Sequence, residues 1–147
     1  MTNNSKILLV DDEPGMLASS KALLETADYE VVIAQGGKAA IEKLEQDEFD
    51  LVLLDMNMPE VNGHMVMEFI NDKLIKVAVV VLSGDFDFNS VARAFQLGAF
   101  DYIKKPFEFD ELQHTLKNAL RKQEVEKSLY TLRKQLERSE RLHRFMV

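Results

Sequence analysis

The feature that most constrains this 147-residue chain is a series of short, continuous apolar runs. The three longest read ILLV, LVLL and VAVVVL, without the alternation of apolar and polar residues that marks a strand with one wet face. Continuous runs of this length predict strands that are buried on both faces, as in a parallel sheet. Together with two shorter runs, the predicted strands cover residues 6–10, 30–34, 51–54, 77–82 and 101–103.

Segments with helical spacing of apolar residues lie between these runs. Pro14 stands where the first turn of the first helix is expected, and Gly98 stands where a left-handed residue should end the fourth helix. Strict alternation of strands and helices predicts an α/β fold, in which helices cover both faces of a doubly wound, five-stranded parallel sheet.

Composition narrows the class of protein. Hydrophobic residues make up 46% and charged residues 29% of the chain, as in a folded domain, and the length suits one domain with an appendage. The absence of cysteine excludes a disulfide framework and a Cys-based zinc site. No signal-peptide pattern follows MTNNSK, and no apolar stretch approaches ~20 residues. We therefore expect a soluble, cytoplasmic protein with no membrane partner.

The net charge of −7 is unevenly distributed. Residues 1–107 contain 18 acidic and 9 basic side chains, whereas residues 121–147 contain 4 acidic and 8 basic ones. An acidic body repels the phosphates of nucleic acid. We therefore expect no direct nucleic-acid binding, and any DNA contact should come from a partner domain.

Polar residues collect directly after the predicted strands. Ligands bind at the carboxyl ends of the strands in sheets of this kind, so a site is expected there. Simpler interpretations exist for single residues: Asp12 and Ser83 could cap helices, and Lys105 could be a solvated loop lysine. The residues at these positions are Asp11, Asp12 and Glu13, then Asp55 and Asn57, then Ser83 and Gly84, and finally Lys104 and Lys105.

Asp55 is harder to explain as an ordinary surface residue. It ends a wholly apolar strand, where an unpaired charge is costly. Carboxylates from neighbouring strand ends would crowd together, and two charges ~4 Å apart repel by ~4 kcal/mol at an effective dielectric constant near 20. Only oxygen ligands are offered, which favours Mg²⁺. With Lys105 and the Ser83 hydroxyl nearby, the same residues would suit a transferring phosphoryl group.

These residues resemble the receiver domains of bacterial response regulators over roughly residues 5–121. The matching segments are ILLVDDEP, LVLLDMNMPEVNG, VVVLSG and LGAFDYIKKPF, in that order. The resemblance implies a flavodoxin-like sheet with strand order 2-1-3-4-5. It also implies phosphorelay signalling by a phosphoacceptor switch, which assists its own phosphorylation and dephosphorylation and is not an enzyme in the usual sense.

The resemblance also assigns the acceptor and the metal ligands. Asp55 would accept a phosphoryl group from the phosphohistidine of a histidine kinase or phosphotransfer protein. Asp12, Asp55 and the backbone carbonyl of Asn57 would bind Mg²⁺, with Asp11 helping through a water molecule.

Three further roles follow from the same resemblance. Ser83 would be the switch hydroxyl that turns toward the phosphate, Lys105 would pair with the phosphoryl oxygens, and Tyr102 would change rotamer with the switch. Receiver domains often have a cis peptide bond before the proline at the position of Pro106. Asn57 and Asp85 occupy the variable positions that tune the lifetime of the phosphate.

The end of the chain predicts a long helix. After Pro106 there are 41 residues without Gly or Pro, and Asp110 and Glu111 suit a helix start. A helix over residues 110–146 would be ~55 Å long, so its far half cannot pack on its own domain. We therefore divide the chain into a receiver domain, residues 1–121, and a helical extension, residues 122–147.

The helical extension has the spacing of a coiled-coil seam. Val125, Leu129, Leu132 and Leu136 recur at intervals of four, three and four residues. We expect a homodimer through this seam and through the face formed by the fourth helix, fifth strand and fifth helix. A solvated single helix or a frayed linker is the alternative. The final LERSERLHRFMV resembles the lead-in to a PAS sensory domain.

Three other functions are weighed against this interpretation. A haloacid dehalogenase-type phosphatase would need Asp-x-Asp after the first strand, where this chain has adjacent Asp11 and Asp12. An FMN carrier would not place the acidic loop DDEPG beside a phosphate. A pure dimerisation module remains the main alternative, and phosphorylation of Asp55 distinguishes it from a receiver.

Overall fold

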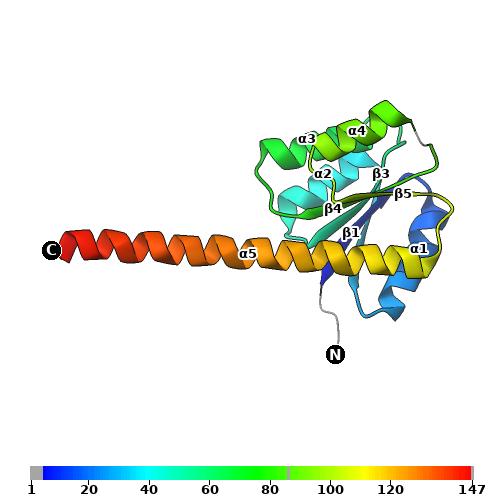
Figure 1. Ribbon diagram of the computed structural model, residues 1–147. Helices are drawn as coiled ribbons and strands as arrows, with labels where there is room; N and C mark the ends of the chain where they lie inside the picture. Colours follow the sequence, from blue (N-terminus) through cyan, green and yellow to red (C-terminus); the bar gives the residue numbers. More distant parts are fainter. Residues whose placement is uncertain (1–4, 86, 147) are drawn as a thin grey trace.

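A computed structural model describes residues 5–85 and 87–146 and shows a five-stranded parallel sheet of order β2-β1-β3-β4-β5 (Figure 1). The predicted strand order and α/β class are therefore confirmed. In chain order the elements are β1 (Lys6–Asp11), α1 (Pro14–Thr26), β2 (Glu30–Gln35), α2 (Gly37–Gln46), β3 (Leu51–Asp55), α3 (Gly63–Asp72), β4 (Ala78–Ser83), α4 (Phe88–Gln96), β5 (Asp101–Lys104) and α5 (Phe109–Met146).

Two apolar layers sandwich the sheet. Alternate residues of β1 and β3 face opposite sides, as the period of two in a strand requires. Leu8 and Val52 pack with residues of α2, α3 and α4, whereas Ile7 and Leu51 pack with residues of α1 and α5. All residues of β3 and β4 are buried, which explains why their sequences are continuously apolar.

The helix boundaries follow local chemistry. Pro14 occupies the first turn of α1, where its missing N–H costs nothing. The Asn62 side chain accepts a hydrogen bond of 3.0 Å from the Met65 N–H and so caps α3. Gly98 has φ +103° just after α4, as its position in the sequence predicted.

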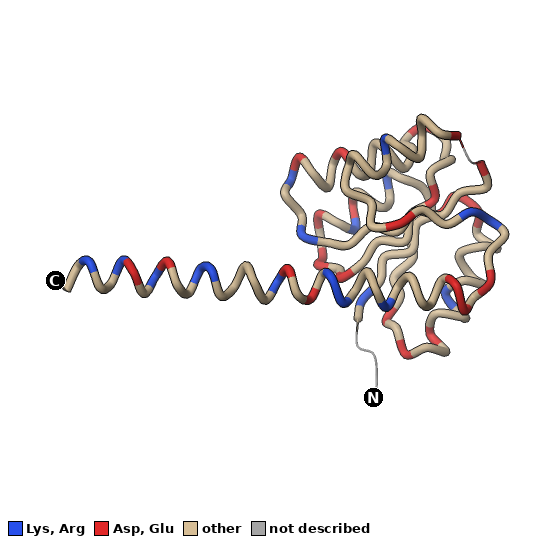
Figure 2. The backbone as a smooth tube through the Cα atoms, viewed as in Figure 1, with Lys and Arg blue, Asp and Glu red and all other residues tan. Residues whose placement is uncertain are grey.

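One unbroken helix, α5, continues far beyond the sheet (Figure 1, yellow to red). Its buried residues end at Gln123. Beyond that point Lys127 pairs with Asp50 at 3.4 Å, and Lys76 lies over the Tyr130 ring. The later residues project away from the domain, and Figure 2 shows Lys and Arg recurring along them. No helix in residues 5–85 or 87–146 combines the length and apolar character needed to cross a membrane.

Candidate functional site

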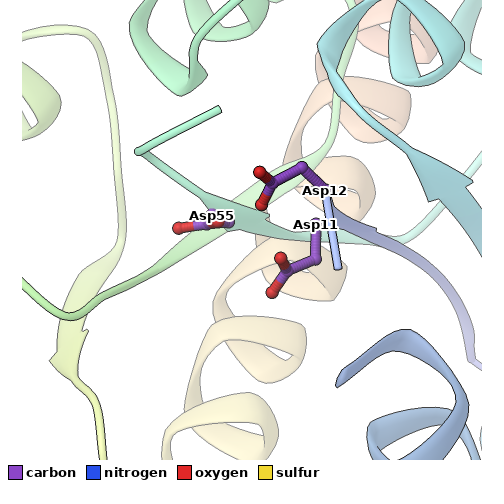
Figure 3. A group of neighbouring side chains, drawn as sticks. All are labelled: Asp11, Asp12 and Asp55. Atoms are coloured by element: carbon purple, nitrogen blue, oxygen red, sulfur yellow. The ribbon is translucent and has the colours of Figure 1, made fainter. Parts of the chain in front are cut away.

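Three carboxylates converge at the carboxyl edge of the sheet (Figure 3). Since β1 pairs with β3 in parallel, with Val10 opposite Leu54, Asp11 and Asp55 end neighbouring strands. Asp11, Asp12 and Asp55 each offer an oxygen, and these oxygens lie within 4.8 Å of one another. Asp11 and Asp55 are only 5% and 7% exposed. The structure therefore brings together the carboxylates that the sequence placed at two separate strand ends.

Lys105 supplies the positive charge beside this cluster. Its Nζ lies 3.0 Å from Asp11 Oδ2 and 3.9 Å from Asp55 Oδ1, and its side chain is 20% exposed. Its backbone N–H donates to the Ser83 carbonyl at 2.8 Å, which fixes the start of the loop after β5. The peptide bond between Lys105 and Pro106 is cis. Lys105 is thus a partly buried partner of the carboxylates and not a solvated loop lysine.

The charges in this cluster are only partly balanced. Burial raises the pKa of Asp55 to about 6, and the negative charges of Asp11 and Asp12 add to the rise, whereas Lys105 opposes it. Burial would also raise the pKa of Asp11, but the hydrogen bonds from Lys105 and from the Glu13 N–H outweigh it and lower that pKa. One lysine therefore compensates Asp11 but leaves Asp55 crowded.

Ser83 and Asn57 form a second, polar part of the site. Ser83 is fully buried, and its Oγ donates to the Asp85 carbonyl at 3.1 Å and accepts from Asn57 Nδ2 at 3.2 Å. The same Asn57 amide donates to Asp85 Oδ2 at 3.3 Å. Ser83 does not cap α4, whose N-cap is Asp87. The hydroxyl is held by contacts from the loops that follow β3 and β4.

Tyr102 joins this network from β5. Its hydroxyl donates to the Asp85 carbonyl at 3.0 Å, so Tyr102 and Ser83 share one acceptor. From the sequence, Asp85 is only a variable position, and this link is not apparent. No local signal could have revealed it, because Tyr102 lies 17 residues from Asp85 along the chain.

Close packing holds the loop after β3 against the site. A Cβ on Gly63 would lie 2.9 Å from the Asp55 carbonyl oxygen and 2.5 Å from Met56 Sδ, so only glycine fits there. The Asn57 N–H points back to Asp55 Oδ1 at 3.3 Å. Gly63 lies within the segment LVLLDMNMPEVNG that resembles receiver domains, but the sequence alone does not indicate this packing role.

The donor set suits a hard divalent cation. Asp11, Asp12 and Asp55 contribute only carboxylate oxygens, and within the described residues they are the one acidic group gathered closely enough to hold a metal. Mg²⁺ prefers few protein oxygens and keeps several waters, whereas zinc prefers His and Cys. The residues present therefore fit Mg²⁺.

Comparisons with known proteins agree with this geometry. Residues 7–117 match the family model of the response regulator receiver domain. The transcriptional regulatory protein CrdR of Helicobacter pylori is 42% identical over 113 residues, which are 76% of this chain and 53% of CrdR. This chain thus spans about half the length of that relative.

Two solved structures show similar folds. The response regulator TrrA of Thermotoga maritima, in complex with Mg²⁺-BeF, has 32% identity and a TM-score of 0.71, covering 78% of this chain and 98% of that chain. A fusion containing a trimeric coiled-coil segment of yeast Spc42 has 25% identity and a TM-score of 0.82, covering 100% of this chain and 99% of that chain. On the family match and the fold, this chain belongs to the response regulator receiver domains of two-component systems.

Proposed function

We propose that Asp55 is the phosphoacceptor of this receiver domain and takes its phosphoryl group from a histidine kinase or phosphotransfer protein. The observation that carries the proposal is the position of Asp55, buried at the end of β3 between Asp11, Asp12 and Lys105. We further propose that the switch works in the cytoplasm, and that residues 1–121 form the receiver and residues 122–147 the helical extension.

The chemistry requires an ionised carboxylate. Without a bound metal, the Asp55 pKa of about 6 already leaves the group mostly deprotonated at neutral pH. An Asp55 oxygen attacks the phosphorus of the donor phosphohistidine, the phosphorus–nitrogen bond breaks, and the imidazole leaves with its electron pair and takes up a proton. Water later hydrolyses the acyl phosphate, which resets the switch.

Charge stabilisation comes from the surrounding residues. Lys105 would turn from the carboxylates toward the phosphoryl oxygens, where its charge stabilises the transferring group. Asp12, Asp55 and the Asn57 carbonyl would hold Mg²⁺, and Asp11 would act through a water molecule. Bound there, Mg²⁺ would neutralise charge on the phosphoryl oxygens.

The shared acceptor on Asp85 supports a switching role for Ser83 and Tyr102. If Ser83 turns toward a phosphate on Asp55, it must give up its hydrogen bond to the Asp85 carbonyl, and the hydrogen bond from Tyr102 changes with it. Helix α4, next to this loop, packs on the domain through few buried residues. Within the described helix only Ala94 is buried, and Phe88 is 78% exposed. A small change in the loop can therefore alter the α4–β5–α5 face.

We also propose that a second copy of the chain pairs with this face and with the helical extension. Val125, Leu129, Leu132 and Leu136 are 52–60% exposed. The domain-facing side of the same helix carries Gln123, which is buried, and Lys127, which pairs with Asp50. The apolar stripe therefore points away from its own domain and is available to a partner.

Helix α5 contributes both to the α4–β5–α5 face and to the helical extension, so it joins the two parts of the proposed interface. Lys122 precedes the apolar stripe, and its Nζ lies 5.7 Å from the centroid of the Phe100 ring, just before β5. In a parallel pairing with Val125 at a d position, Arg121 at g would face Glu126 at e of the partner helix, an attractive charge pair. We infer that any DNA contact belongs to another domain, because the body of this chain is acidic.

Intact-mass spectrometry tests the central proposal. Incubation with acetyl phosphate and Mg²⁺ should add one phosphate to the wild type and none to Asp55→Asn. Asp50→Asn is the matched control, since Asp50 lies just before the opposite end of the same strand, and this variant should be labelled like the wild type. Equal labelling of Asp55→Asn and the wild type would refute the assignment, and no labelling of the wild type would favour a pure dimerisation module.

A further inference from the structure

The proposed metal site has two halves that come from different parts of the chain. Asp11 and Asp12 lie at the end of β1, whereas Asp55 and Asn57 belong to β3 and the loop after it, residues 56–62. An octahedral Mg²⁺ site tolerates little error in the positions of its oxygens. Asp11 and Asp55 end paired, neighbouring strands, so the sheet sets their separation, whereas the position of Asn57 depends on what packs against the loop after β3.

The start of α2 packs there. The residues that lead into it are tied to the β1 half: the N–H of the N-cap Gly36 donates to the Asp11 carbonyl at 2.9 Å, and Nε2 of Gln35, the last residue of β2, donates to the Asp12 carbonyl at 3.4 Å. On the other side, α2 meets the loop after β3 at Gly37, which is buried. The start of α2 thus contacts both halves of the site.

Contact with the loop is as close as glycine allows. A Cβ built on Gly37 would lie 2.6 Å from Val61 Cγ1 and 2.8 Å from Val61 Cβ, and nearer still to the Val61 carbonyl oxygen. The φ of Gly37 is not in the left-handed region, unlike that of Gly36 at +94°. Glycine is therefore required at position 37 by lack of space and not by backbone conformation.

A displacement of Val61 would be passed toward Asn57. The Val61 N–H donates to the Pro59 carbonyl at 2.8 Å, so residues 59–61 form a tight turn. Met58, which precedes this turn, is 6% exposed and packs in the core. Asn57 precedes Met58 directly, and so it receives any shift that the turn cannot absorb.

We infer that Gly37 is a positioning residue for the metal site, setting the distance of the Asn57 carbonyl from the Asp11 and Asp12 carboxylates. This inference rests on the proposed Mg²⁺-dependent function. A methyl group at position 37 pushes the loop outward and spoils the oxygen geometry without removing a ligand. Loss of supporting contacts around metal ligands commonly costs ~10–100-fold in affinity. We expect Gly37→Ala to raise the Mg²⁺ dissociation constant by at least ~10-fold.

The experiment compares two glycines in the first turns of helices. Gly15 in α1 has nothing within 4 Å of a built Cβ, so Gly15→Ala is the matched control for Gly37→Ala. Isothermal titration calorimetry gives the Mg²⁺ dissociation constant, and urea unfolding in EDTA gives the stability of the metal-free fold. Gly37→Ala should weaken Mg²⁺ binding while remaining cooperatively folded in EDTA, and Gly15→Ala should bind like the wild type.

A second variant keeps the test decisive. The nearest obstacle is a backbone oxygen, so adding Val61→Ala to Gly37→Ala should not restore Mg²⁺ affinity. Restored affinity would still place the obstacle at Val61 and would support the inference, whereas equal dissociation constants for Gly37→Ala and the wild type would overturn it. Val61→Ala alone leaves the carbonyl oxygen in place and should bind Mg²⁺ like the wild type. A wild type that does not bind Mg²⁺ would refute the proposed function itself.

Discussion

Replacing Asp55 with asparagine should stabilise the metal-free protein at neutral pH. Asp55 is 7% exposed, and burial with two neighbouring carboxylates raises its pKa from 3.8 to about 6. The folded state therefore holds the proton of Asp55 more tightly than the unfolded state does. As the pH rises from 3.8 to about 6, the unfolded chain releases the proton first. The free energy of unfolding therefore falls, and it stays lower above about pH 6.

The pKa difference sets the size of the effect. A shift from 3.8 to about 6 corresponds to at most about 3 kcal/mol of lost stability above the folded pKa. Near pH 4.5 the lost stability is only about 1 kcal/mol, because Asp55 is then mostly protonated in the folded state. Asp55→Asn removes the titrating group. Its free energy of unfolding should therefore exceed that of the wild type by about 1 kcal/mol near pH 4.5 and by about 3 kcal/mol above the folded pKa.

Urea unfolding in EDTA at about pH 4.5 and pH 8 measures this gain. Asp11, whose pKa is lowered, contributes stability that is lost on acidification in both proteins. Glu45→Gln, at an exposed position of α2, is the control for loss of one charge and should show no such growth with pH. An Asp55→Asn variant no more stable than the wild type at pH 8 would refute the crowded-carboxylate account.

Three other outcomes are expected. Mg²⁺ at a hundredfold excess over its dissociation constant should stabilise the wild type by ~2.7 kcal/mol, and Asp12→Ala should lose most of that gain; coinciding thermal melts in EDTA and in millimolar Mg²⁺ would contradict the cation site. Tyr102→Phe removes a hydrogen bond to the Asp85 carbonyl and should cost about 1 kcal/mol of stability without preventing phosphorylation by acetyl phosphate; unfolding and mass measurements check both parts. Truncation after Arg121 should weaken association in analytical ultracentrifugation, with and without beryllofluoride; unchanged association constants in both states would leave the helical extension as a tether only.

The elements of the fold could be predicted because their signals are local. Continuous apolar runs identify strands covered on both faces, Pro14 begins a helix and Gly98 ends one, and each of these signals depends on residues within a few positions. The carboxyl-edge rule then indicated which polar residues would meet, and the structure does bring Asp11, Asp12 and Asp55 together. Their roles in phosphorylation and metal binding remain predictions.

Only the tertiary structure determined the contacts that link distant segments. Lys105 reaches Asp11 across 94 residues of chain, and Lys127 reaches Asp50 across 77. The fit of Gly37 against the Val61 carbonyl depends on how the first turn of α2 packs on the loop after β3. Apolar pattern and turn chemistry specify each element, but such distances depend on how whole elements pack against one another, and close packing makes them sensitive to a single methyl group.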